Sequence, residues 1–350
     1  MHRIVLAAVW IVVCFSAAHA QSGASWPEAD RLFHADPRWL GADGAFSVDL
    51  GEGRVLWIFN DSFVAKRQGD DRRHAAFVHN TVAIQQGYDP SRATIHFYWR
   101  TKQGAPSEIY PNEGDVWMWP SSGIRVGSRL LLFATRVGAD HAPHSLGFKL
   151  LGWNAYWVDN PDEEPSAWTL RVVEQRNDAV VMASSLVRKG AYVYAFGASE
   201  PQHDLYVARM QASSLEKGEL GTIEWWTGSG WDASDAKRKA IASDTGTETS
   251  VQADPRGGGY IGVYSKGFGG SIIVMQTAKE LTGPWSASMP LYRPPESDAP
   301  GAFVYAGKSH AELQGADLVL TYAANGPDEK VLGDMRLYFP RFVRVNLKQP

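Results

Sequence analysis

The feature that most restricts the fold is a β-hairpin pattern that recurs five times along the 350 residues. Each copy has a strand pattern, a turn with polar residues or glycine, and a second, very apolar strand, such as residues 55–59 of the first copy. The copies begin near residues 43, 117, 181, 248 and 310, at intervals of roughly 62 to 74 residues. Sustained helical periodicity is almost absent.

A second pair of strand patterns follows the hairpin in most copies, for example residues 81–85 and 94–99 after the first. Four strands per repeat and five repeats predict an all-β, five-bladed β-propeller, because each blade of a propeller is a four-stranded sheet. No linker rich in proline or serine divides the chain, so we expect one domain. A β-sandwich with coincidental spacing is the alternative.

The first residues have the layout of a secretory signal peptide. Arg3 precedes an apolar run over residues 4–15, and Ala18-His19-Ala20 forms a cleavage site of small residues. The run is too short for a spanning helix, which needs about 20 residues. We therefore expect residues 1–20 to be removed, residues 21–350 to form the propeller, and the product to be secreted or periplasmic, without membrane insertion.

Composition excludes several classes of protein. The one cysteine, Cys14, lies in the apolar run, so the mature chain would have no disulfide, thiolate nucleophile or cysteine-bound metal. The net charge is −4 and no basic stripe is present, which argues against a nucleic-acid partner. The 14 Trp, 13 Tyr and 14 Phe residues could stack on sugar rings or fill β cores. We expect a monomer that requires no cofactor.

Two aspartates of the first hairpin are the main catalytic candidates. Asp43 and Asp61 each lie nine residues from Glu52, at the centre of the turn, so a regular hairpin places them opposite each other. Their Cβ atoms would then be about 5 to 8 Å apart. Repulsion between the carboxylates would raise one pKa. Glycosidic cleavage uses such a pair of acid and carboxylate. Capping of a turn is the alternative for each residue.

In a propeller, the first strands of all blades start at one mouth of the central channel, so polar and aromatic residues near those starts are candidates for substrate binding. They are Glu248, His310, Glu312, Asn80, Asp115, Trp117, Trp119 and Arg136. His310 could bind substrate, tune a carboxylate or hold an ion in the channel; a hydrogen-bonded structural histidine is the alternative. The two tryptophans could stack on sugar or wedge the blades together.

Residues 39–48 and 53–63 resemble the opening of a group of secreted five-bladed propellers, some of which are endo-D-arabinanases of glycoside hydrolase family 183. Asn60 and Ser62 replace the glycine and threonine usual in that pattern. The resemblance implies that Asp43 and Asp61 are catalytic. Residues 281–285 and the strand at Glu248 resemble blade 4 of the wider superfamily that includes the family 43 glycosidases. A blade-5 histidine can help to hold a calcium ion there, which implies that role for His310.

The function predicted from sequence is a glycoside hydrolase that acts on a polysaccharide, with an arabinofuranoside-containing glycan such as D-arabinan as the preferred substrate. By analogy with the superfamily, inversion is slightly favoured over retention. A non-catalytic glycan-binding propeller of the cell envelope is the first alternative, and a structural or protein-binding propeller is the second.

Overall fold

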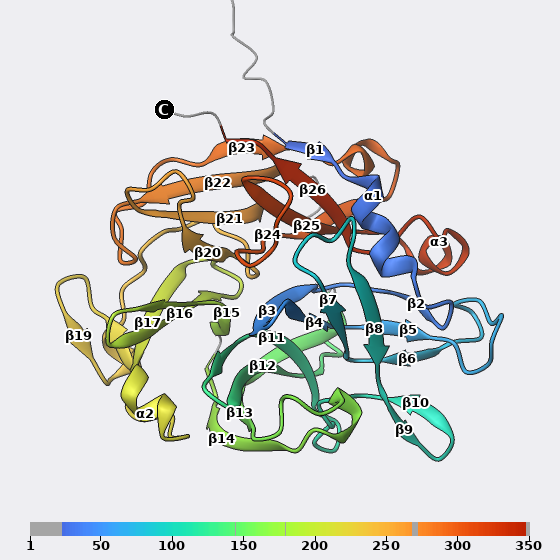
Figure 1. Cartoon of the computed structure of the whole chain (residues 1–350), viewed down its shortest axis with the longest axis horizontal. Coiled ribbons are helices and arrows are strands. Elements are labelled where there is room, and N and C mark those ends of the chain that lie inside the picture. Colours follow the sequence, from blue (N-terminus) through green and yellow to red (C-terminus); the bar gives the residue numbers. More distant parts are fainter. Residues whose placement is uncertain (1–22, 144, 179, 268–271, 348–350) are drawn as a thin grey trace, which may run out of the picture.

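The computed structural model describes residues 23–143, 145–178, 180–267 and 272–347 (Figure 1). The predicted signal peptide lies outside these residues. The described chain is built of antiparallel strands, which confirms the prediction of an all-β fold. Its α-helices are short: α1 (Pro27–Asp30), α2 (Ala212–Glu216) and α3 (Asp328–Gly333). Four 3-10 segments accompany them: η1 (Arg31–His34), η2 (Pro165–Ala167), η3 (Asp235–Lys237) and η4 (Pro295–Asp298). No helix within the described ranges is long and apolar enough to cross a membrane.

Five sheets of four or five strands make up most of the described chain. The first contains β3 (Phe46–Gly51), β4 (Arg54–Phe59), β7 (Thr81–Gln86) and β8 (Thr94–Tyr98). The second contains β11 (Trp117–Val126), β12 (Arg129–Ala139), β13 (Phe148–Val158) and β14 (Leu170–Arg176). The third contains β15 (Val180–Lys189), β16 (Tyr192–Ser199), β17 (Leu205–Gln211), β18 (Glu224–Trp226) and β19 (Trp231–Asp232).

The fourth sheet contains β20 (Ser250–Ala253), β21 (Tyr260–Lys266), β22 (Ile272–Ala278) and β23 (Met289–Tyr292). The fifth contains β24 (Phe303–Ser309), β25 (Leu318–Asn325), β26 (Arg341–Val345) and β1 (Gly23–Ser25). Two smaller sheets extend the first: β2 (Trp39–Ala42), β5 (Ser62–Val64) and β6 (Ala76–Val78) form one, and β9 (Arg100–Lys102) and β10 (Ala105–Ser107) form the other.

The first strand of each large sheet lies nearest the middle of the molecule (Figure 1). Along the chain, β3 packs against β11, β11 against β15, β15 against β20, and β20 against β24. Hydrogen bonds join the fifth sheet to the first, one from Lys308 to Gly44 O and one between Ser47 and His310. Strand β1 pairs with β26, with Gly23 opposite Val345, so the two ends of the described chain complete the same sheet.

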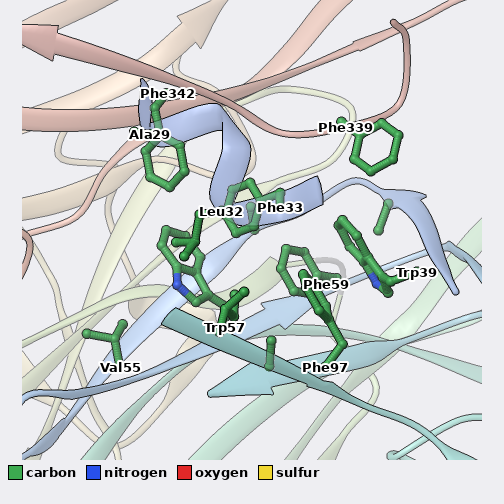
Figure 2. Packing of buried hydrophobic residues seen from close by; sticks show 14 of the residues in the cluster. Ala29, Leu32, Phe33, Trp39, Val55, Trp57, Phe59, Phe97, Phe339 and Phe342 are labelled. Atoms are coloured by element: carbon green, nitrogen blue, oxygen red, sulfur yellow. The ribbon is translucent and has the colours of Figure 1, made fainter. Parts of the chain in front are cut away.

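The apolar second strands are buried because neighbouring sheets cover both of their faces. In β4, all residues from Val55 to Phe59 are buried. Figure 2 shows Trp57 and Phe59 of this strand packed with Phe33 of η1 and Phe342 of β26. The Phe33 ring lies 4.9 Å from that of Phe342 and 5.0 Å from that of Trp57, between centroids. The N-terminal segment therefore joins the first and fifth sheets.

The inner strands are irregular where they approach the middle. Register shifts occur between Val181 and Ser185 in β15 and between Tyr305 and Lys308 in β24, and Ala183 and Ala306 there have φ of 57°. Such bulges bend a strand and change the direction of its side chains. The structure also corrects the predicted start of the fifth copy. Residues 303–309 form the inner strand, because they pair with β25, and His310 follows its end.

Candidate active site

Backbone hydrogen bonds hold the Asp43 and Asp61 segments together, as the hairpin register predicts. The Asp43 N–H donates to Asp61 O over 3.4 Å, and the Asn60 N–H donates to Asp43 O over 3.1 Å. Gly44 is needed at this point, because its φ is +80° and a Cβ there would lie 3.0 Å from the backbone nitrogen of Asn60. The segments lie at the start of β3 and the end of β4, on one side of the first sheet.

The Asp43 carboxyl is half-buried and is held through one oxygen. Its Oδ2 accepts a hydrogen bond of 2.5 Å from the Tyr305 hydroxyl, whereas Oδ1 is buried and has no partner among the described residues. Burial raises the pKa of Asp43, the charge of Asp61 raises it further, and the value reaches about 8 although Tyr305 opposes the shift. This shift favours the protonated form of Asp43 at neutral pH.

Tyr338 packs on the same carboxyl in a strained conformation. Its φ is +60°, in the left-handed region, which is uncommon for a bulky side chain and costs about 1–3 kcal/mol. Its ring is buried, and burial followed by the charge of Asp43 raises the pKa of its hydroxyl. Buried Arg72 fixes this segment by donating to the backbone oxygens of Val331 and Leu337 over 2.7 and 2.6 Å.

The Asp61 carboxylate is also held through one oxygen. His79 Nδ1 lies 2.9 Å and Trp119 Nε1 lies 3.0 Å from Oδ1. The indole can only donate, so Oδ1 is the acceptor of that hydrogen bond. No hydrogen bond from a described residue reaches Oδ2. The His79 ring stacks on Trp117, with the centroids 4.8 Å apart and the planes 16° apart. The predicted tryptophans thus adjoin Asp61, and so does His79, which was not among the predicted residues.

Glu248 approaches Asp43 by way of Lys308. The Glu248 Oε2 and Lys308 Nζ atoms are 2.6 Å apart. Lys308 is buried, donates to Gly44 O and, over 2.8 Å, to Ala306 O, and lies 4.5 Å above the ring of Phe46. Burial lowers the pKa of Lys308, and the charge of Glu248 opposes that shift. The cation holds two acidic segments together. Lys308 was not among the predicted residues, because the inner strand of the fifth copy was expected to begin only at residue 310.

Three further residues that were predicted to bind substrate lie in different surroundings: one is beside the tryptophans, one is exposed in a loop and one is buried. Arg136 lies opposite Met118 of β11, next to both tryptophans, and donates to Asn177 Oδ1 over 3.0 Å. Asp115 is exposed in the loop before β11 and has no hydrogen bond to a described residue. The prediction for Asn80 is wrong, because Asn80 is fully buried and its amide bonds to the backbone of Tyr110 and Met118, which leaves nothing for a substrate.

His310 and Glu312 lie away from the aspartates, contrary to the prediction that they start the fifth blade. The ring nitrogens of His310 are bonded to Ser47 Oγ (2.6 Å) and Thr321 Oγ1 (2.8 Å). Burial, with the nearby cation of Lys308, lowers the pKa of His310 well below its usual value. No ring nitrogen is free for calcium, and within the described ranges no three His, Cys, Asp or Glu side chains group as metal ligands. These contacts do not fit a calcium ligand.

Comparisons with known proteins agree with this fold. A family model described as "Domain of unknown function (DUF5005)" matches residues 28–347. The crystal structure of a candidate hydrolase from Bacteroides ovatus superposes with a TM-score of 0.75 at 17% identity, over 92% of this chain and 90% of that one. An exo-β-1,3-galactanase from Phanerochaete chrysosporium, with bound β-1,3-galactotriose, gives a TM-score of 0.52 at 12% identity, over 87% of this chain and 60% of that one. At these identities the likeness shows the fold alone. No curated protein matches in sequence.

Proposed function

The chain belongs to the DUF5005 family, and we propose that it is a glycoside hydrolase that uses Asp43 as general acid and Asp61 as general base. One observation carries the proposal: two neighbouring aspartates have opposite environments. Burial raises the pKa of Asp43, whereas His79 and Trp119 hydrogen-bond one oxygen of Asp61 and leave its other oxygen without a partner among the described residues. Pairs of carboxyl groups whose environments separate their protonation states are the usual machinery of glycosidic cleavage.

The chemistry follows from these two groups. Asp43 transfers its proton to the glycosidic oxygen as the bond from that oxygen to the anomeric carbon breaks. Asp61 takes a proton from a water molecule whose oxygen attacks that carbon, which is the inverting route that the sequence resemblance favours. Asp61 is then protonated and Asp43 ionised, and exchange with solvent restores the starting forms. Oδ2 of Asp61 is the oxygen available to the water molecule. Oδ1 of Asp43 has no partner but is buried, so it must be uncovered before it can meet the glycosidic oxygen.

We infer that the five large sheets are the blades of a propeller and that the aspartates lie at one mouth of its central channel. The order of the inner strands and the pairing of β1 with β26 support this interpretation. Aromatic side chains beside Asp61, namely Trp117, Trp119 and His79, offer faces on which a sugar could stack. An arabinofuranoside-containing glycan and a secreted or periplasmic location are the finer proposals, and both rest on the sequence resemblance and the N-terminal pattern.

The test is release of products from a panel of polysaccharides, with D-arabinan, L-arabinan, xylan and β-1,3-galactan as separate substrates. Wild-type protein should release reducing ends from at least one of them, and Asp43→Asn and Asp61→Asn should each reduce the rate by at least about 10³-fold. Asp328→Asn, at an exposed aspartate of α3, is the matched control and should retain the rate. Binding of one glycan with equal affinity by all these proteins, without release of product, would instead support the glycan-binding module.

A further inference from the structure

A cavity of about 430 Å³ lies among the inner strands of all five large sheets, and neither Asp43 nor Asp61 lines it. Its walls come from residues later in each inner strand than those of the candidate active site. In β3 the lining runs to Asp49, six residues beyond Asp43, and after β24 it runs to Glu312, seven residues beyond Tyr305. At about 3.3 Å per residue, the far end lies roughly 20 Å from the aspartates. Asp49 and Ala311 are exposed there, so the cavity opens on the opposite face.

Lys308 separates the cavity from the aspartates. It lines the cavity, and its ammonium group binds Gly44 O on the side of Asp43 and pairs with Glu248. Because the side chain is buried and its donors are used by these partners, it is fixed between the cavity and Asp43. A molecule that enters from the opposite face would therefore not reach the reacting carboxyl groups. The cavity is a second compartment of the same channel.

The cavity wall is rich in hydroxyl groups and holds two acceptors without partners. Serine residues from all five inner strands line it. Gln252 Oε1 and Glu312 Oε1 are buried and have no hydrogen-bond partner among the described residues. A buried acceptor left without a donor costs about 1–3 kcal/mol. Both side chains are only half-buried, and rotation about the last bond of either one turns its orphan oxygen toward a donor inside the cavity.

The inner part of the cavity carries little net charge, and the exposed carboxylate of Asp49 lies at its open end. Burial raises the pKa of Glu312 and lowers that of His310, so both side chains are biased to their neutral forms. Lys308 is paired with Glu248, and at the open end both amino groups of the Arg125 guanidinium bind Asp162 over 2.8 Å. Such a wall does not attract an ion, but its donors and acceptors match those of a neutral molecule with several hydroxyl groups.

We propose that this cavity is a second, non-catalytic site for an uncharged sugar of monosaccharide size, held by Gln252 and Glu312 and entered from the face opposite the aspartates. The volume lies in the range of small-molecule pockets, about 300 to 1,000 Å³. Gln252 and Glu312 bind sugar hydroxyl groups. Most lining serines donate their own protons to protein acceptors, so their oxygens act toward the sugar as acceptors. This site is independent of hydrolysis, so it stands or falls separately from the proposed activity.

The test is a titration of the protein with D-arabinose, L-arabinose, D-xylose and D-galactose, followed by calorimetry and by ligand-observed NMR. We expect saturable binding of at least one of these sugars. Gln252→Leu and Glu312→Leu should each weaken it at least about tenfold, because each removes a buried acceptor. Asp43→Asn should bind as the wild type does, and so should Gln86→Leu, a matched control at an exposed glutamine of β7. Thermal melts identify variants that fail to fold, and Ser122→Ala, a milder change in the same wall, then replaces them.

Two results would overturn the proposal. Absence of saturable binding to any of the four sugars would mean that the cavity holds water only. Binding that is lost in Asp43→Asn but persists in the Gln252 and Glu312 variants would place the sugar at the candidate active site instead. Neither result bears on hydrolysis, which the product-release assay measures separately.

Discussion

Replacement of Asp43 by asparagine should change the pH dependence of stability in a defined direction. The pKa of Asp43 rises from 3.8 to about 8 on folding. Between these values the folded protein keeps a proton that the unfolded chain has released. Raising the pH therefore favours the unfolded state, and this contribution to stability is complete below about pH 4 and lost progressively up to about pH 8. Asparagine does not titrate, so the variant lacks this loss.

The magnitude follows from the size of the shift. One pKa unit corresponds to about 1.4 kcal/mol, so wild-type stability should fall relative to Asp43→Asn by at most about 1.4 kcal/mol for each pH unit in this range. Between pH 5 and pH 7 the difference is at most about 3 kcal/mol, and residual contact of Asp43 with solvent reduces it. Urea unfolding of both proteins at pH 5, 6, 7 and 8 measures it.

Asp328→Asn is the control for this measurement, because Asp328 is exposed and its replacement should not alter the slope with pH. A difference between wild type and Asp43→Asn that stays constant from pH 5 to pH 8 would refute the reasoning. It would mean that Asp43 is ionised throughout that range and cannot act as the acid.

Three further variants test other contacts. Tyr305→Phe removes a donor that lowers the pKa of Asp43, so the alkaline limb of the pH–activity profile should move to higher pH and kcat should fall about tenfold. Lys308→Met leaves Glu248 without its cation and should reduce the free energy of unfolding in urea by about 3–5 kcal/mol, with partial recovery on adding Glu248→Gln. Arg72→Met leaves buried carbonyl oxygens without a donor and should lower the free energy of unfolding in urea by at least about 2 kcal/mol. Arg73→Met, which removes an exposed ion pair, should lower it by less than about 1 kcal/mol. Equal losses in the two arginine variants would contradict the role given to Arg72.

The repeat predicted much of the fold because it reflects a physical constraint. A strand that is covered on both faces must be apolar throughout, and residues 55–59 show this in the sequence and are buried in the structure. The fifth copy was misplaced because β24 ends in Gly307, Lys308 and Ser309, and this short polar run interrupts the strand pattern before His310. Lys308 is tolerated in this buried strand because it pairs with Glu248. Glu248 is distant in the chain, so this pair cannot be recognised from the local sequence.

The aspartate pair could be predicted from the sequence because two residues at equal distances from the turn lie opposite each other in a regular hairpin. The partners of each aspartate could not, since Tyr305 lies 262 positions from Asp43 and Trp119 lies 58 positions from Asp61. His79 had a local signal, because it follows β6 near the aspartates, but a histidine in a short polar segment is not specific. The prediction for Asn80 failed for the same reason. A polar side chain at the end of a strand can either bind substrate or hydrogen-bond to the backbone, and the burial of Asn80, which distinguishes these roles, is not visible in the sequence.

The most direct test of the central claim is the dependence on the leaving group in the two aspartate variants. Once the cleaved sugar is known, the activities on the polysaccharide and on its 2,4-dinitrophenyl glycoside are compared, because the latter departs without protonation. We predict that Asp43→Asn loses activity on the polysaccharide but keeps it on the dinitrophenyl glycoside, whereas Asp61→Asn loses both. Loss of only the polysaccharide activity in Asp61→Asn, with Asp43→Asn inactive on both, would reverse the roles. Full activity of either variant on the polysaccharide would contradict the account.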